Sequence, residues 1–226
     1  MVGQNGKPKG LFLAMLALGS MCGLVEVVAG NALHQTGIHF SGLLVGLGCV
    51  LIGIGLAIYR KPWMILGMGL VACMCKQLVV PVLGMAFACK ANSCLAVLLE
   101  YGSLAGISAL TLNSMRKNTG ARILTAGSGI FLGSVIYYFA GMRVSPCPYM
   151  LSFNAAGGFI NFVTKEGLVW AAFSAALFPL GWSIAEQVSK KTAVMFEQKP
   201  RLFYLGTALT TAVCLIACII SIALQG

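Results

Sequence analysis

Seven runs of predominantly apolar residues follow one another along this chain, separated by short polar or basic segments. Crossing the ~30 Å hydrocarbon core of a bilayer takes about 20 apolar residues in a helix, and each run has about that length. Only 9% of the 226 residues are charged and 59% are hydrophobic, which excludes a water-soluble domain. We therefore predict one integral membrane domain, 1–226, an all-α polytopic transmembrane helical bundle of six or seven spans. The runs cover roughly residues 11–30, 40–59, 63–86, 94–113, 122–142, 163–187 and 202–224.

The apolar stretch from Tyr149 to Phe162 is not counted as a span. Pro146 and Pro148 stand at its start and a Gly157–Gly158 pair falls inside it, and both residue types disrupt a regular helix. A crossing here would also move the following basic segment to the opposite side of the membrane. We expect residues 149–162 to form a re-entrant or interfacial piece.

Basic residues are concentrated at the N-terminus and after the second, fourth and sixth runs. If the helices simply alternate, these segments share one side, and the other side keeps only Lys90, Arg143 and the borderline Lys165. Because cytoplasmic loops are enriched in Lys and Arg, this predicts a cytoplasmic N-terminus. The formal net charge of +10 then reflects topology, and no nucleic-acid partner is expected. The basic residues on the predicted cytoplasmic side are Lys7, Lys9, Arg60, Lys61, Arg116, Lys117, Arg122, Lys190, Lys191, Lys199 and Arg201.

Three of the five glutamates, Glu26, Glu100 and Glu166, lie inside or at the ends of apolar runs, together with Lys76. Ionisable groups in hydrocarbon cost at least ~2.5 kcal/mol each, so they normally face a protein interior. With a rise of ~1.5 Å per residue, Glu26 and Lys76 lie about 20 Å above the cytoplasmic ends of their helices. Glu100 lies roughly 9 Å below the outer surface, and Glu166 begins its helix there. All four are expected in the outer third of the membrane.

Two interpretations of these charges remain open. In the first, Glu26 or Glu100 pairs with Lys76 as a structural ion pair that fixes helix register. In the second, the charges line a polar site open to the outside, because three carboxylates and one amine cannot all pair one to one. The substrate-binding residues predicted by the second interpretation are Glu26, Lys76, Glu100, Glu166, Asn31, His34, His39, Gln77 and Asn161, with Asn31, His34, His39 and the Tyr149–Asn161 segment as rim or lid.

Metal, disulfide and enzyme chemistry receive weaker support from the sequence. Glu26, His34 and His39 are the weak candidates for metal ligands, but two loop histidines without a helical HxxxH or a paired CxxC do not predict a metal site. Cys89 and Cys94 flank an outer turn, and an oxidising exterior would allow a disulfide between them. No phosphate-binding glycine loop, redox-cofactor motif or nucleophile–base spacing is evident, so no catalytic residue and no enzyme activity are predicted.

Pairs of glycines four residues apart recur in the runs, and such pairs let membrane helices approach closely. We expect them mainly to serve packing within the bundle, with a docking surface for a partner as the alternative. The pairs are Gly19/Gly23, Gly42/Gly46, Gly102/Gly106 and Gly129/Gly133.

The segments GLVEVVAGNALHQTGIHFSGLLVGLGCVLIGIG, GLVACMCKQLVVP and CLAVLLEYGSLAGISAL together resemble the substrate-specific (S) components of energy-coupling factor transporters. The resemblance covers about Gly10 to Met142 and is a pattern of spans and polar positions. It implies a compact helical bundle that binds a vitamin or metal ion from outside, with Glu26 and Glu100 as polar positions of the pocket. It also implies a transmembrane coupling subunit and cytoplasmic ATPases as partners, in a prokaryotic cytoplasmic (inner) membrane.

The chain departs from that family at several points. S components typically have six spans, and this sequence predicts a seventh. A glycine pair, Gly19/Gly23, replaces the alanine pair that would dock the coupling subunit, and the N-terminal MVGQNG lacks the histidine motif of the metal-specific branch. We therefore expect a membrane-embedded binding subunit for uptake of a small micronutrient, a vitamin-like molecule or a metal or metal chelate. The alternative is a structural or anchoring subunit of a larger respiratory or transport complex.

Overall fold

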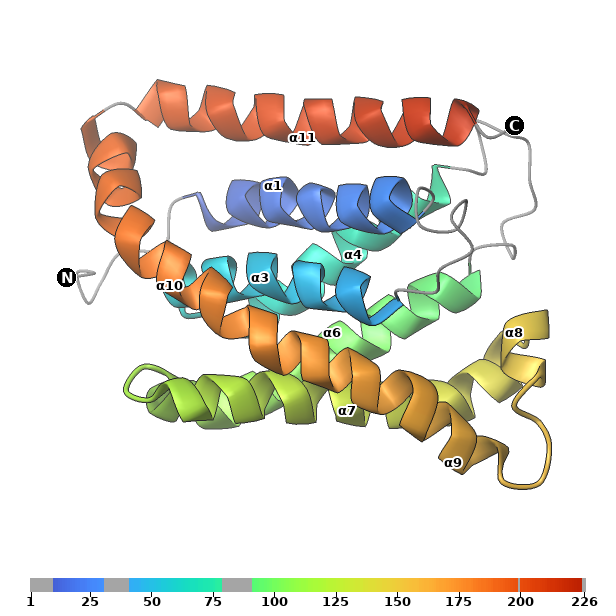
Figure 1. Ribbon diagram of the computed structural model, residues 1–226. Coiled ribbons are helices and arrows are strands. Elements are labelled where there is room, and N and C mark those ends of the chain that lie inside the picture. Colours follow the sequence, from blue (N-terminus) through green and yellow to red (C-terminus); the bar gives the residue numbers. More distant parts are fainter. Residues whose placement is uncertain (1–9, 31–40, 79–90, 199, 225–226) are drawn as a thin grey trace.

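The computed structural model describes residues 10–30, 41–78, 91–198 and 200–224, with the backbone alone over 189–198 and at Pro200. All regular structure in these ranges is helical, which confirms the predicted all-α fold (Figure 1). The elements are α1 (Leu11–Leu24), its π-helical continuation η1 (Val25–Ala29), α3 (Ser41–Tyr59), α4 (Trp63–Gln77), α6 (Ala91–Met115), α7 (Thr119–Val144), α8 (Pro148–Leu151), α9 (Gly158–Phe162), the π-helical turn η3 (Val163–Gly167), α10 (Leu168–Gln198) and α11 (Pro200–Ala223).

Six of the described helices are long and apolar enough to cross a membrane, so the chain is an integral membrane protein. The helix Trp63–Gln77 is apolar but shorter, and the remainder of the third predicted run falls in residues 79–90, outside the described residues. The six are Leu11–Ala29, Ser41–Tyr59, Ala91–Met115, Thr119–Val144, Gly158–Val188 and Arg201–Ala223.

The helices alternate in direction along the bundle. The turns after α3, α6 and α10 lie at the end where the chain begins, and α8, α9 and the C-terminus lie at the opposite end (Figure 1). The first end therefore gathers the turns that carry Arg60, Lys61, Arg116 and Lys117, and we call it the basic end; the other is the α8 end. The alternation matches the one from which the cytoplasmic N-terminus was predicted, and the orientation itself stays a prediction.

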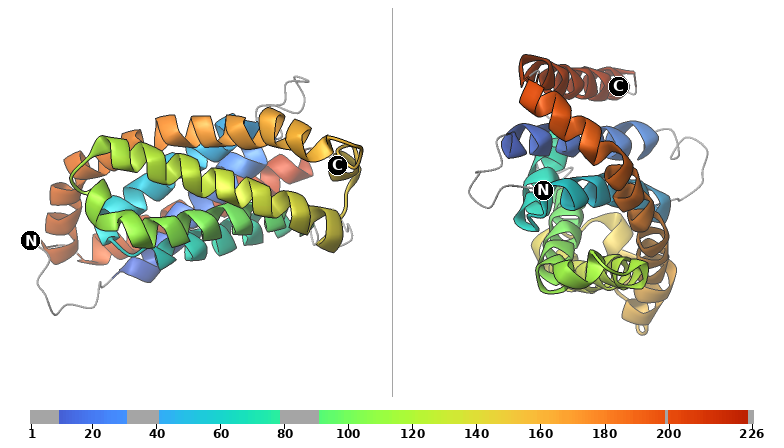
Figure 2. Two further views of the ribbon diagram at one scale, coloured as in Figure 1. Left: turned by 90° about the horizontal axis from the view of Figure 1, so that it is seen from below. Right: turned by 90° about the vertical axis from the view of Figure 1, so that its left-hand side faces the viewer.

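Six helices form a closed ring in the order α1, α4, α6, α7, α10, α3, each packed against the next and α3 packed back against α1. The seventh long helix, α11, lies outside this ring, mainly on α1 (Figure 2). Most of its side chains are exposed. The additional span that the sequence predicts is thus a peripheral helix added to a six-helix body.

Close helix contacts in the ring depend on glycine at particular positions. A Cβ on Gly23 would lie 2.5 Å from the Cβ of Cys75 in α4, and one on Gly133 would lie 2.6 Å from the Cα of Glu100 in α6. Three of the predicted glycine pairs face another ring helix in this way, whereas Gly106, of the Gly102/Gly106 pair, has open space beside it. Packing within the bundle accounts for three of the four pairs.

Residues 149–162 do not make a span of their own. They include the short helix α8, a bend and α9, at the α8 end of the bundle (Figure 1). Gly157 has a left-handed φ of 77°, which favours glycine, and α9 then continues through η3 into α10. The segment is therefore partly a connection and partly the first turns of a long helix.

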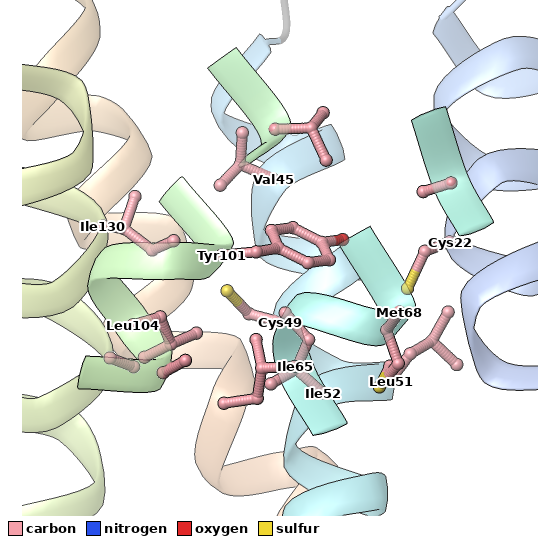
Figure 3. Packing of buried hydrophobic residues seen from close by; sticks show 14 of the residues in the cluster. Cys22, Val45, Cys49, Leu51, Ile52, Ile65, Met68, Tyr101, Leu104 and Ile130 are labelled. Carbon is pink, nitrogen blue, oxygen red and sulfur yellow. The ribbon is translucent and has the colours of Figure 1, made fainter. Parts of the chain in front are cut away.

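Between the level of Glu26, Lys76 and Glu100 and the basic end, the interior of the ring is filled by apolar side chains of the ring helices. Tyr101 of α6 extends across it, with its hydroxyl directed toward Cys22 of α1 (Figure 3). Cys49, Ile52 and Met68 surround the ring of Tyr101 and are fully buried. We call these four residues and Cys22 the Tyr101 layer.

Candidate functional site

An ion pair between Lys76 and Glu26 joins two ring helices. The Nζ of Lys76, on α4, lies 2.7 Å from Oε2 of Glu26, on η1, and it also donates a hydrogen bond of 2.6 Å to Oγ of Ser93 on α6. The side chains of Lys76 and Glu26 are only 10% and 14% exposed. Lys76 thus connects three helices, and of the two partners left open by the sequence it is Glu26 that forms the pair.

Glu26 and Glu166 both lie in π-helical turns, η1 and η3. A π-turn inserts one residue into an α-helix, which changes the direction of the side chains around it, and such turns are frequent at functional sites. The turn η1 directly follows α1, and η3 leads directly into α10, so each insertion is local. The π-turns aim both carboxyl groups at partners on other helices.

Glu100 differs from the other two carboxyl groups because the described residues give it no comparable partner. Its side chain is only 3% exposed, on the stretch of α6 that packs against Gly133 of α7. The charges of Glu26 and Lys76 act on it, but among the described residues no hydrogen bond to its carboxyl group is found. A buried carboxylate without hydrogen bonds is costly in a protein interior. Glu100 is therefore the surplus acid of this region.

Glu166 links the other side of the ring. Its Oε2 accepts hydrogen bonds from Oγ of Ser41 at 2.7 Å and from Nε1 of Trp170 at 3.0 Å. Ser41 begins α3 and Trp170 lies one turn after Glu166, so the carboxylate ties α3 to α10. These neutral donors hold the carboxylate in place, and the Tyr149 hydroxyl of α8 also interacts with it.

A group of polar and aromatic side chains lies between Glu100 and Glu166. Asn92 of α6 donates through Nδ2 to the hydroxyl of Tyr137 at 2.8 Å and to Sγ of Cys147 at 3.0 Å. The Tyr137 ring lies 6.1 Å from Phe162 and 6.2 Å from Trp170, between ring centroids. The charges of both Glu100 and Glu166 act on Tyr137. Tyr137 therefore stands between the two acidic positions.

Contacts along α7 show that Glu100 and Glu166 share one level of the bundle. Gly133 packs against the backbone of Glu100, and the next residue, Ser134, packs against Gly167, beside Glu166. Each ring helix provides a polar side chain near this level or between it and the α8 end, if η1 is counted as part of α1. These side chains are Glu26 from η1, Ser41 from α3, Lys76 from α4, Glu100 and Asn92 from α6, Tyr137 from α7 and Trp170 from α10. These residues, with Gln77, Ser93 and Glu166, form the outer polar cluster.

Two buried side-chain amides in this cluster have an unused acceptor. Oε1 of Gln77 and Oδ1 of Asn92 are buried without a hydrogen-bond partner, while the nitrogen of Gln77 donates to Sγ of Cys94 at 3.4 Å. Buried polar atoms are rarely left unsatisfied. The two other atoms of this kind among the described residues belong to Ser108 and Ser174. In the outer polar cluster the unsatisfied atoms are acceptors.

The structure brings together five of the nine residues predicted to bind substrate: Glu26, Lys76, Gln77, Glu100 and Glu166. Asn161 is exposed on α9 and is not brought to them, because its neighbour Phe162 takes the inward position. The other three, Asn31, His34 and His39, lie outside the described residues.

The metal and disulfide predictions are touched only in part. Within the described ranges no three His, Cys, Asp or Glu side chains are grouped so as to hold a metal ion, and two of the three weak candidates, His34 and His39, fall outside those ranges. Cys94 is a buried free thiol next to Cys73, with its Sγ 3.8 Å from the Cys73 carbonyl oxygen. Cys89 also lies outside the described residues, so the disulfide between Cys89 and Cys94 gains no support and stays a prediction.

Sequence reasoning missed Asn92, Ser93, Tyr137 and Trp170. Trp170 could have been found, because it follows Glu166 by four residues and residues at that spacing share a helix face. Asn92 and Ser93 stand in a stretch that reads as a turn, ACKANSC, but they belong to the first turn of α6. Nothing in the local pattern singles out Tyr137.

Comparison with known proteins gives no relative from which a role could be transferred: no family model matches this chain, and no curated protein and no solved structure is similar to it.

Proposed function

We propose that this chain is the membrane-embedded substrate-binding subunit of an uptake system for a small micronutrient, a vitamin-like molecule or a metal or metal chelate. The outer polar cluster is its binding site. The site works by placed hydrogen bonds and charges and needs no covalent chemistry, as is usual for binding sites with a few polar groups in apolar surroundings.

The observation that carries this proposal is the unpartnered Glu100. A bundle built for stability alone has no use for a buried carboxyl group without hydrogen bonds, because a glutamine or an apolar residue there would be less costly. The pair Glu26–Lys76 already fixes the register of α1 against α4. Glu100 adds an acidic group that this pair does not neutralise, and a bound solute would satisfy it.

The asymmetry of the bundle interior supports access from one side. The outer polar cluster lies toward the α8 end, and the buried Tyr101 layer (Figure 3) lies between it and the basic end. With the predicted cytoplasmic N-terminus, the cluster faces the exterior. A solute entering from outside would be stopped at the Tyr101 layer, so delivery to the cytoplasm requires the subunit to move.

That movement needs an energy source outside this chain, because no phosphate-binding glycine loop is present in the sequence. A transmembrane coupling subunit and cytoplasmic ATPases are the proposed partners, in the prokaryotic cytoplasmic membrane. Purification of the tagged chain from its own host in mild detergent tests this: ATPase subunits should co-purify. Recovery of redox or assembly subunits in their place would contradict the uptake role.

Binding is tested directly by the thermal unfolding of the purified chain over a panel of vitamins, haem and divalent metal ions. At least one member should raise the melting temperature, and Glu100→Gln and Glu26→Gln should reduce that rise. Glu186→Gln is the matched control, since Glu186 lies in the last turn of the span Gly158–Val188 and α10 ends at the basic end (Figure 1). If both cluster variants keep every response of the native chain, the binding site is not where we place it.

The alternative, a structural or anchoring subunit of a larger complex, is favoured by one feature, the peripheral helix α11. It packs mainly on α1 and leaves most of its apolar side chains exposed. Such a helix could contact a neighbouring subunit as readily as lipid. Deletion of residues 200–226 separates the two roles: solute binding should survive it, whereas assembly into a larger complex should not.

A further inference from the structure

The outer polar cluster contains more acceptors than donors, and this identifies the kind of solute it would take. Its charged side chains are Glu26, Glu100, Glu166 and Lys76, so carboxyl groups exceed amines by two among the described residues. Lys76 is already engaged by Glu26 and Ser93. Glu166 is held by its two neutral donors. What remains to be matched is Glu100.

The unsatisfied neutral atoms have the same character. Oε1 of Gln77 and Oδ1 of Asn92 are acceptors without donors, and the Asn92 side chain is only 8% exposed. Gln77 follows Lys76 on α4 and its nitrogen donates to Cys94 of α6, so its side-chain amide lies between the two helices that carry Lys76 and Glu100. A ligand that brought only acceptors or a negative charge would leave all of these atoms unmatched.

We propose that the site takes an organic cation, a solute whose positively charged nitrogen carries N–H groups, such as a protonated amine or an amidinium, with Glu100 as its counter-ion. This inference rests on the proposed solute-binding function and names its substrate class. The N–H groups donate to the Glu100 carboxylate and to Oε1 of Gln77. The charge compensates a buried acid that the described residues leave without a hydrogen bond or an ion pair.

Buried aromatic side chains stand next to the cluster on its α10 side. Phe162 and Trp170 are buried, their ring centroids lie 5.8 Å apart, and both lie about 6 Å from Tyr137. The charges of both Glu100 and Glu166 act on Tyr137, which places it near both acids. Aromatic faces attract cations and apolar rings alike. Once these side chains part to admit it, a cation with an apolar or aromatic part matches them better than a small hydrated ion does.

The test compares solutes of one skeleton that differ in charge. The purified full chain is exposed to three sets, each with a cation, a neutral analogue and an anion: benzamidine, benzamide and benzoate; phenethylamine, phenethyl alcohol and hydrocinnamate; tryptamine, tryptophol and indolepropionate. Thermal unfolding and calorimetry report binding. The cation should bind in at least one set and exceed its neutral and anionic counterparts by about ten-fold or more in affinity.

Variants then assign that preference to Glu100. Glu100→Gln should remove the advantage of the cation over the neutral analogue, and Glu186→Gln should leave it unchanged. If Glu100→Gln fails to fold, the ranking of the three charge classes on the native chain decides the proposal by itself. Neutral or anionic members that bind as well as the cations overturn the substrate class and leave the binding function intact. If none of the nine compounds and no member of the vitamin and metal panel binds, both the binding function and the substrate class are overturned.

Discussion

Two ion pairs, one partly exposed and one largely buried, stand toward opposite ends of the bundle and are built differently. Toward the basic end, Arg122 of α7 donates to Glu186 of α10 at 2.8 Å and to the carbonyl oxygen of Met115 at 2.8 Å. Its guanidinium lies 4.9 Å from the ring centroid of Trp182, whose Nε1 also donates to Glu186. We call these four residues the clasp. Toward the α8 end, Lys76 pairs with Glu26, and Glu100 is left over.

We interpret the difference between the clasp and the outer polar cluster as that between a structural ion pair and the proposed binding site. In the clasp one cation meets one acid, and hydrogen bonds and an aromatic face support both. In the cluster one cation meets two acids, and two amide oxygens are also unmatched. A pair that fixes register needs only the first arrangement. On our proposal, the surplus acceptors are matched by a bound solute.

The largest effect is expected from Lys76→Met, which removes the cation from between two acids. Glu26 and Glu100 would then be buried together without a counter-charge, and loss of one partner of a buried pair typically costs about 3–5 kcal/mol. The free energy of unfolding, measured by titration with a denaturing detergent, should fall by about that amount. The triple variant Lys76→Met/Glu26→Gln/Glu100→Gln should recover most of it. A loss below about 1 kcal/mol would show that water already reaches the acids.

Arg122→Met should have the next largest effect and tests the clasp. It removes a charge-assisted hydrogen bond and a cation–π contact, together about 2 kcal/mol. The side chain of Glu186 is 55% exposed, so the acid left behind stays partly hydrated and the loss is smaller than for Lys76→Met. The same detergent titration measures it, and ligand affinity should not change. A change in affinity would mean that the two regions are coupled.

Glu26→Gln should destabilise less, by about 1 kcal/mol. Lys76 loses its direct partner, but the charge of Glu100 acts on the same ammonium and can replace it in part. In this variant the surplus acid is used up inside the protein, so affinity for a cationic solute should also fall. If stability drops as far as in Lys76→Met, Glu100 does not reach Lys76 and is isolated from the pair.

The smallest change in stability is expected from Glu100→Gln, and its sign is the informative part. Replacing an unpaired buried carboxyl group by a neutral amide of similar shape should leave the ligand-free chain unchanged or stabilise it by about 1 kcal/mol. Ligand-dependent stabilisation should disappear at the same time. A clear loss of stability without ligand would show that Glu100 supports the fold, and the contrast with the clasp would then be lost.

Much of the fold was predictable because the membrane sets simple rules. The length of an apolar helix and the fixed rise per residue determine which runs can span and how deep each charge lies. That reasoning placed Glu26 and Lys76 at a common depth, and they form a pair of 2.7 Å. The rise places Glu100 there too, and both charges act on it. These results depend on distance along a helix, which follows directly from the residue numbers because the rise per residue is fixed.

What the sequence left open depends on rotation and order around the ring. The sequence left Glu26 and Glu100 as equal candidates to pair with Lys76. Glu26 forms the pair from the π-turn η1, which no local sequence pattern predicts. Trp170 and Tyr137 reached the cluster because α10 packs between α7 and α3. The sequence by itself determined that the chain spans a membrane and where its charges lie along the helices. Only the tertiary structure decided which charges meet and that Glu100 is left over, because facing across helices is set by packing, which distance along one helix cannot encode.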